Sequence, residues 1–351
     1  MLEHPVVQAP MAGGTSTPEL VAAVARAGAL GFLGAGYKTA AATRAEIERT
    51  RGLTGEPFGV NLFMPSRDGI DDAAVAAYRD RLLPEAERLG VEPGTPRARD
   101  DDWDAKVADL LADPPAYVSF TFGFPSDDVV RAFQRRGAVV IATVTSADEA
   151  RQAASADALC VQGAEAGAHR GSFANTLGDV PPVRDLVRAV RHAARQPVIA
   201  AGGLATAAHV AEALALGAVA AQCGTAFLRC PESGASTVHK AALADPRFTR
   251  TAMTRAFSGR PARGLVNRFL AEHSGRRPPR TRTSTTSPRR CARRARRGAT
   301  PTWSTCGRAS RSGWPRTPPP SRSSRPSRRT PDAAPHHGGR GVHVAGRGVG
   351  L

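Results

Sequence analysis

A single histidine stands among small residues in the stretch QGAEAGAHRGSF, which covers residues 162–173. The stretch follows the apolar run ALCV and shows no strand or helix pattern of its own. Gly163 and Gly167 leave space for a flat ligand, and the amide of Gln162 can hydrogen-bond a heteroaromatic ring. Because an imidazole titrates near neutral pH, His169 is a candidate general base beside that ligand. Taken in isolation, a loop histidine is more often an exposed surface group, and that alternative stays open.

Two glycine-rich turns further along the chain have the composition of a phosphate-binding site. They are AAGGLAT (200–206) and QCGTAF (222–227), each at the end of an apolar run. Glycine lets backbone N–H groups approach a phosphate closely, and a following helix presents its positive end there. Asn61, inside the apolar run GVNLF, is either a further ligand or a satisfied core amide.

Eight short apolar runs must position these residues. Near-continuous apolar composition is typical of strands that are buried on both faces. The runs are residues 6–10, 31–36, 58–63, 117–122, 138–144, 158–163, 197–203 and 219–227. Because helical patterns alternate with them, they predict an α/β fold, a (β/α)8 TIM barrel, with its reactive groups at the C-terminal ends of the strands. An open, doubly wound sheet is the alternative.

Alanine-rich stretches between these runs carry helix start and stop signals. Several open on Ser, Thr or Asp and close on Gly, as helix caps do. The stretches are residues 16–28, 41–52, 125–137, 146–156 and 206–217. The segment 65–116 is longer than one crossover requires, so it predicts a short excursion beside the barrel mouth after the third strand.

The net charge of +17 is concentrated at one end of the chain. Residues 276–351 contain 19 arginines, no lysine and one acidic residue, which leaves 29 basic and 30 acidic side chains elsewhere. This Arg-, Pro- and Ser-rich segment lacks hydrophobic periodicity, which predicts disorder. Read in the neighbouring frame with GC-rich codons, residues 299–314 become GDADVVNLWAGQSFRL, which indicates a frameshift. We therefore expect a catalytic domain over residues 1–275 and a disordered or out-of-frame tail over residues 276–351.

Composition argues against several other classes of protein. The five cysteines form no CxxC pair and no zinc-ligand spacing with histidine, so no metal site is predicted and a reducing cytoplasm is expected. No apolar run reaches the roughly 18 residues that span a bilayer. The tail lacks the interleaved aromatic residues and the recognisable fold of a specific nucleic-acid binder, so a nonspecific polycation is the alternative there.

Six motifs, in order from about residue 5 to residue 270, resemble the nitronate monooxygenase family, also called 2-nitropropane dioxygenases. They are VVQAPMAGG, PFGVNLF, QGAEAGAHRGSF, PVIAAGGLAT, AAQCGTAFL and FSGRPARGLVNRF. The members of this family are FMN-containing TIM barrels. The resemblance implies that O2 oxidises an alkyl nitronate, such as propionate 3-nitronate, to a carbonyl compound and nitrite. A related FMN barrel that uses NAD(P)H, an enoyl or quinone reductase, is the alternative.

The resemblance also implies roles for particular residues. His169 matches the catalytic histidine that abstracts the α-proton of a neutral nitroalkane, whereas an anionic nitronate needs no such base. The implied FMN ligands are Asn61, Gln162, Gly167, Gly202, Gly203, Gln222, Cys223, Gly224 and Thr225. The family continues after FSGRPARG with a helical segment that contains a run like LWAG. This run is absent from the given frame and present in the shifted reading.

Overall fold

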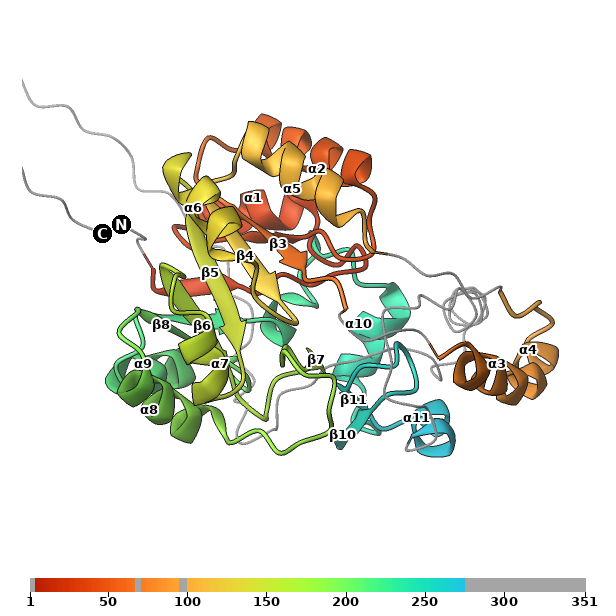
Figure 1. Cartoon of the computed structure of the whole chain (residues 1–351). Coiled ribbons are helices and arrows are strands. Elements are labelled where there is room, and N and C mark those ends of the chain that lie inside the picture. The colour runs from red at the N-terminus through yellow and green to blue at the C-terminus, as the bar shows by residue number, and fades with distance from the viewer. Residues whose placement is uncertain (1–3, 67–70, 95–99, 275–351) are drawn as a thin grey trace, which may run out of the picture. The chain divides into compact units, whose positions relative to one another are not determined.

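The computed structural model describes residues 4–66, 71–94 and 100–274, and its centre is a sheet of eight parallel strands (Figure 1). The strands are β1 (Val6–Gln8), β2 (Phe32–Gly34), β3 (Gly59–Phe63), β4 (Tyr117–Thr121), β5 (Val139–Val144), β6 (Ala158–Gln162), β8 (Val198–Ala201) and β9 (Ala220–Cys223). A parallel bridge between Val7 and Leu30 joins the first strand to the second, and β9 pairs with β1. The ring of strands is therefore nearly closed, which confirms the predicted TIM barrel and excludes the open sheet.

Helices alternate with the strands in the described part of the chain. They are α1 (Pro18–Arg26), α2 (Ala40–Leu53), α5 (Trp103–Ala112), α6 (Asp127–Arg135), α7 (Ala147–Gln152), α8 (Val183–Ala193), α9 (Ala207–Ala215) and α10 (Thr237–Ala244). Several begin at a capping residue: Thr17, Thr39, Ser146 and Thr206 each accept a hydrogen bond from the backbone N–H three residues later. The five predicted helical stretches are confirmed, whereas α5, α8 and α10 were not predicted.

The inner face of the barrel changes from apolar to polar along the strands. Near their N-terminal ends the inward side chains form one apolar cluster, which includes Val7, Phe32, Ile141, Ala158, Ile199 and Ala220. Near their C-terminal ends strand alternation places polar side chains on the same face. These are Asn61, Ser119, Thr121, Thr143, Gln162 and Gln222. The polar end is the one at which TIM barrels carry their active sites.

The predicted excursion is shorter than the segment 65–116. Its last part, α5, is an ordinary barrel helix, because Leu110 packs in one apolar cluster with Ile47 of α2 and Val118 of β4. The remaining part contains α3 (Asp72–Arg81) and α4 (Leu83–Arg88). The segment is rich in Pro, Asp and Arg, and this composition concealed the apolar face of α5.

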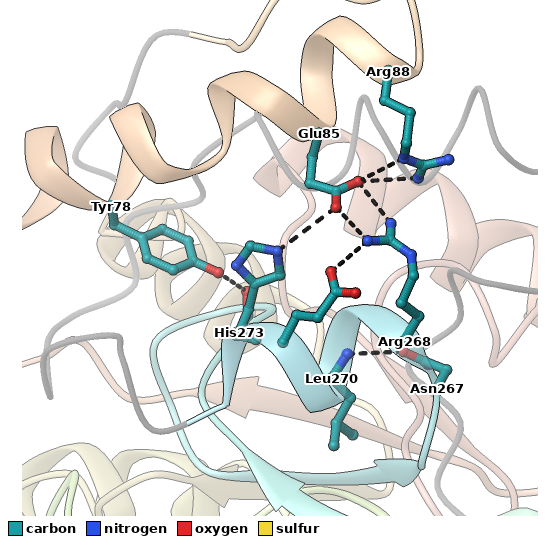
Figure 2. A network of polar contacts seen from close by, with 9 residues as sticks. Tyr78, Glu85, Arg88, Asn267, Arg268, Leu270 and His273 are labelled. Atoms are coloured by element: carbon teal, nitrogen blue, oxygen red, sulfur yellow. Dashed lines mark hydrogen bonds and ion pairs between the residues drawn. The ribbon is translucent and has the colours of Figure 1, made fainter.

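Helices α3 and α4 pack against the last helix described, α11 (Arg268–His273), as Figure 2 shows. Glu85 accepts hydrogen bonds from both terminal nitrogens of Arg268, with N–O distances of 2.6 and 2.8 Å, and from Arg88. The Tyr78 hydroxyl donates to the carbonyl oxygen of Ala256 at 2.8 Å. The hydrogen bonds from Arg268 hold the pKa of Glu85 below its usual value. The carboxylate therefore ties two segments far apart in sequence.

Replacing Glu85 with glutamine should lower the free energy of unfolding by about 1–2 kcal/mol at pH 7, because a charge-assisted pair is lost. Glu272 also contacts Arg268 but is far more exposed, so Glu272→Gln should cost less than about 0.5 kcal/mol. Because the folded pKa of Glu85 is lowered, its contribution is present above the unfolded pKa and is lost as the pH falls through the folded value. Urea unfolding of both variants at pH 7 and pH 4 tests this: equal losses for the two variants would contradict it.

A second, three-stranded sheet lies beside the barrel. It consists of β10 (Thr251–Thr254), β11 (Ala262–Leu265) and β7 (Ala168–His169), paired antiparallel in that order. Residues 162–173, which show no strand pattern of their own, therefore contain the short strand β7. A strand of two residues has no alternation to detect, and its partner lies more than 90 positions later in the sequence.

The predicted tail, residues 276–351, lies outside the described residues, as does the frameshift prediction. In the described part of the chain, no helix combines the length and the apolar character that crossing a membrane requires.

Candidate active site

His169 lies at the polar end of the barrel, and the strand pairing of β7 holds its backbone. The backbone N–H of the next residue, Arg170, donates to the carbonyl oxygen of Pro261 at 2.9 Å. The Nε2 atom of His169 lies 2.6 Å from the Oγ atom of Ser258. The imidazole is half-buried, so the alternative of a fully exposed surface histidine is excluded. Ser258 was not singled out as a site residue, although it stands in the quoted motif FSGRPARG.

Gln162 holds the loop that carries His169. Its Nε2 atom donates to the carbonyl oxygen of His169 at 3.2 Å, and its Oε1 atom accepts from the backbone N–H of Gly171 at 2.7 Å. A side-chain amide has two donor hydrogens and two acceptor lone pairs, so each end keeps the capacity for one more bond. The contacts show Gln162 as a support of the loop, a function that the sequence did not indicate. Gly167 is half-buried and stands two positions before the histidine.

Gly163 does not make room for a ligand, contrary to the expectation. A Cβ atom at this position would lie 2.4 Å from the backbone nitrogen of Val183, the first residue of α8. The glycine is required because the start of that helix packs directly on it. Since α8 was not predicted, the sequence offered no sign of this contact.

Asn61 is buried at the centre of a polar network. Its Nδ2 atom donates to the backbone oxygen and the hydroxyl of Ser119, at 3.1 and 2.9 Å, and to the hydroxyl of Thr121 at 3.0 Å. Thr121 in turn donates to Thr143 at 3.3 Å. The amide nitrogen of Asn61 is thus satisfied within the barrel wall. A ligand role would depend on its Oδ1 atom.

The turn after β8 is built from two glycines with positive φ. Gly202 has a φ of 113° and Gly203 a φ of 73°, a region that residues with a Cβ atom rarely adopt. A Cβ atom on Gly202 would lie 3.1–3.3 Å from backbone atoms of residues 163 and 166, and one on Gly203 would lie 3.0 Å from the Cβ atom of Glu165. Both glycines therefore permit a close approach of this turn to the loop that carries the histidine.

The side chains of Gln222 and Cys223, at the end of β9, point to opposite faces of the strand. The side chain of Gln222 faces the barrel interior, where it hydrogen-bonds the buried thiol of Cys160. Strand alternation puts Cys223 on the opposite face, and burial raises the pKa of its thiol to about 11. Gly224 and Thr225 are half-buried, and Thr225 begins a 3-10 helix of three residues. Among these four residues, Cys223 can contribute only its backbone to a ligand on the inner side.

Three of the five described residues other than glycine with positive φ lie at the histidine: Tyr37, Phe122 and Ala168. The other two, Asp101 and Asp102, accept hydrogen bonds from the backbone of residues 37 and 40. Ala168 precedes His169 directly, and the rings of Phe122 and Tyr37 have their centroids 5.9 and 6.4 Å from the imidazole. Left-handed backbone costs roughly 1–3 kcal/mol per residue and persists where the surroundings enforce it. Strain that the fold enforces is typical of functional sites, which supports the choice of this region as the candidate site.

Two buried arginines bind the segment that follows His169. Arg260 is buried with its guanidinium 4.2 Å from the ring centroid of Phe122, and it donates to the carbonyl oxygen of Ser172. Arg255, also buried, donates to the side-chain and backbone oxygens of Asn175, at 2.7 and 2.8 Å. Burial lowers the pKa of Arg255. Cations bonded to neutral oxygens favour an anionic ligand nearby.

Replacing Ser258 with alanine removes a hydrogen-bond partner of the imidazole and should lower any reaction that uses His169 as a base about 10-fold, because a base must be oriented by hydrogen bonds. Threonine retains the hydroxyl, so Ser258→Thr should keep most of the rate. Steady-state rates at saturating substrate, with circular dichroism as the control for folding, measure the effect. Equal rates in the alanine variant and the unaltered protein would contradict this role.

Comparison with known proteins agrees with this geometry. The sequence model of the nitronate monooxygenase family matches residues 1–297. A nitronate monooxygenase from Pseudomonas aeruginosa is 44% identical over 278 residues, 77% of this chain and 78% of that protein. One from Paraburkholderia phytofirmans is 41% identical over 287 residues, 79% of this chain and 78% of that protein.

Solved structures are similar as well. The nitroalkane oxidase from Streptomyces ansochromogenes has a TM-score of 0.82 at 47% identity, covering 86% of this chain and 88% of that one. FabK from Thermotoga maritima has a TM-score of 0.60 at 31% identity, covering 77% of this chain and 74% of that one.

Proposed function

Because the chain belongs to the nitronate monooxygenase family, we propose that it oxidises alkyl nitronates with O2 and bound FMN, giving a carbonyl compound and nitrite. Membership makes it an oxidoreductase that acts on a small molecule. The observation that carries the finer proposal is the half-buried His169, held at the polar end of the barrel among arginines. Propionate 3-nitronate is the substrate that we would test first.

The turns after the neighbouring strands β8 and β9 support a phosphate site at this end of the barrel. A Cβ atom on Gly202 or Gly203 would fill the space between this turn and the loop before His169. We propose that the backbone of both glycines, with that of Gly224 and Thr225, binds the phosphate. Bound FMN would supply the one-electron redox chemistry that links the nitronate to O2. Asn61, Gln162, Gly167 and Gln222 are proposed to contact its ring system, and Cys223 to contribute through its backbone.

In this proposal His169 acts only on neutral nitroalkanes, from which it takes the α-proton. The Ser258 hydroxyl, 2.6 Å from Nε2, orients the imidazole for this proton transfer. Gln162, through the carbonyl oxygen of His169, limits the movement of the loop. The buried arginines Arg255 and Arg260 favour the nitronate anion that the proton transfer leaves.

Spectroscopy and nitrite release test the proposal directly. The purified full chain, supplied with FMN, should show a flavin absorbance spectrum and release nitrite from propionate 3-nitronate in the presence of O2. A protein that retains no added FMN would refute the flavin assignment. Rapid anaerobic bleaching of the flavin by NADPH, without nitrite release, would favour the alternative of an NAD(P)H-dependent reductase.

A further inference from the structure

Tyr37 is fixed beside the histidine by a residue of another segment. It stands just after β2 with a φ of 69°. Its backbone N–H donates to the Oδ1 atom of Asp101 at 2.7 Å. Its ring packs edge-on against Phe63, with the centroids 5.5 Å apart, and its centroid lies 6.4 Å from that of His169. The ring thus borders the imidazole, while the carboxylate of Asp101 holds the backbone from which the ring projects.

Asp101 is itself half of a buried ion pair. Its Oδ2 atom lies 3.1 Å from the Nζ atom of Lys106, and the two side chains are only 7% and 1% exposed. Lys106 also donates to the carbonyl oxygen of Ala35 at 3.0 Å. Because Ala35 and Tyr37 are two positions apart, the pair binds the turn after β2 on both sides. Asp102 adds a third attachment, since its Oδ2 atom accepts from the backbone N–H of Ala40 at the start of α2.

A buried ion pair contributes little to stability compared with apolar residues of the same size, because both charges lose their hydration. The pair instead fixes the positions of both side chains, because each buried charge must stay close to the opposite charge. Asp101 also adopts left-handed backbone, with a φ of 68°. Strained backbone on both sides of the hydrogen bond between Tyr37 and Asp101 indicates that this contact is enforced by the fold.

We infer that Asp101 is a positioning residue that acts through Tyr37 to fix the orientation of the His169 imidazole. Lys106 keeps the Asp101 carboxylate in place, and the Tyr37 ring transmits the constraint to the histidine. The effect on catalysis rests on the proposed function, whereas the effect on the imidazole does not. The experiment therefore needs one measurement of catalysis and one of the orientation of the imidazole.

The test uses the full chain with Tyr37→Gly, Tyr37→Phe, Asp101→Ala and the double variant Tyr37→Gly/Asp101→Ala. Glycine tolerates the positive φ and removes the ring, while phenylalanine keeps the ring. Asp113→Asn is the matched control, because Asp113 forms an exposed ion pair with Arg51 at the other end of the same two helices. The ring 1H–15N NMR signals of His169 report its orientation, and turnover of a neutral nitroalkane and of its nitronate reports the chemistry.

We expect Asp101→Ala and Tyr37→Gly to shift the His169 signals in the same direction and to lower nitroalkane turnover about 10-fold, with nitronate turnover nearly unchanged. Tyr37→Phe and Asp113→Asn should resemble the unaltered protein. The double variant should match Tyr37→Gly alone, because both changes act on one path. An Asp101→Ala effect that persists in full on the Tyr37→Gly background would overturn the inference.

Two other outcomes are also decisive. If no variant and no unaltered protein turns over either nitro compound, the proposed function fails, and the NMR signals still decide the positioning role. If Asp101→Ala does not fold, the comparison of Tyr37→Gly with Tyr37→Phe decides, and unchanged His169 signals in Tyr37→Gly overturn the inference.

Discussion

Replacing His169 with asparagine should lower the turnover of neutral nitroalkanes about 10²–10⁴-fold, the usual contribution of a positioned general base. Oxidation of a preformed nitronate should change only a few-fold, because its proton has already left. Asparagine keeps the approximate size and a hydrogen-bonding group for Ser258 but cannot accept the proton. Stopped-flow reduction of the bound flavin without O2, with nitroethane and with its nitronate, measures the two rates separately.

His192 provides the matched control. It is an exposed histidine in the last turn of α8, at the opposite end of the barrel from the site. His192→Asn should leave both rates close to those of the unaltered protein. Equal losses with nitroethane and its nitronate in His169→Asn would show that the histidine binds the substrate or the flavin and does not act as a base.

Replacing Gly202 with valine should reduce the affinity for FMN at least about 100-fold, equivalent to about 2.7 kcal/mol. Two effects add. A φ of 113° is strained for any residue with a Cβ atom, and that atom would lie 3.1 Å from the backbone nitrogen of Ala166. The turn must then move, and its backbone N–H groups leave the proposed phosphate position. Flavin fluorescence titration of the apoprotein gives the affinity.

Gly137→Val separates this effect from a general loss of stability. Gly137 also has a positive φ, 83°, but a Cβ atom there would have no neighbour within 4 Å. It precedes β5, at the opposite end of the barrel from the site. This variant should be destabilised by backbone strain and still bind FMN normally. Flavin bound with normal affinity by Gly202→Val would exclude the phosphate role of that turn.

The barrel could be predicted because its strands are marked locally. Each strand is a compact apolar run, and glycines or capping residues mark the ends of most of the helices between them. The glycines at 202 and 203 could be predicted for the same reason, since a turn directly after a strand needs them. Such a local pattern is sufficient because burial on both faces and a positive φ each restrict the type of residue at a single position.

The contacts of the candidate base could not be predicted in this way. Ser258 reaches His169 because β11 pairs with a strand of two residues, and neither strand has a pattern long enough to reveal the pairing. Gly163 was assigned to ligand space because nothing in the sequence showed that Val183 would pack on it. The contact between Glu85 and Arg268 joins residues 183 positions apart. Such features depend on tertiary packing, which a single sequence does not report.

The pairing of β7 with β11 has a consequence for the order in which the protein is made. All eight barrel strands are encoded before residue 224. The backbone partner of His169, Ala262, and its side-chain partner, Ser258, are added only afterwards. A chain that ends between these points contains every barrel strand and lacks both of these partners of the candidate base. The support of the candidate base is thus synthesised later than the strands of the barrel.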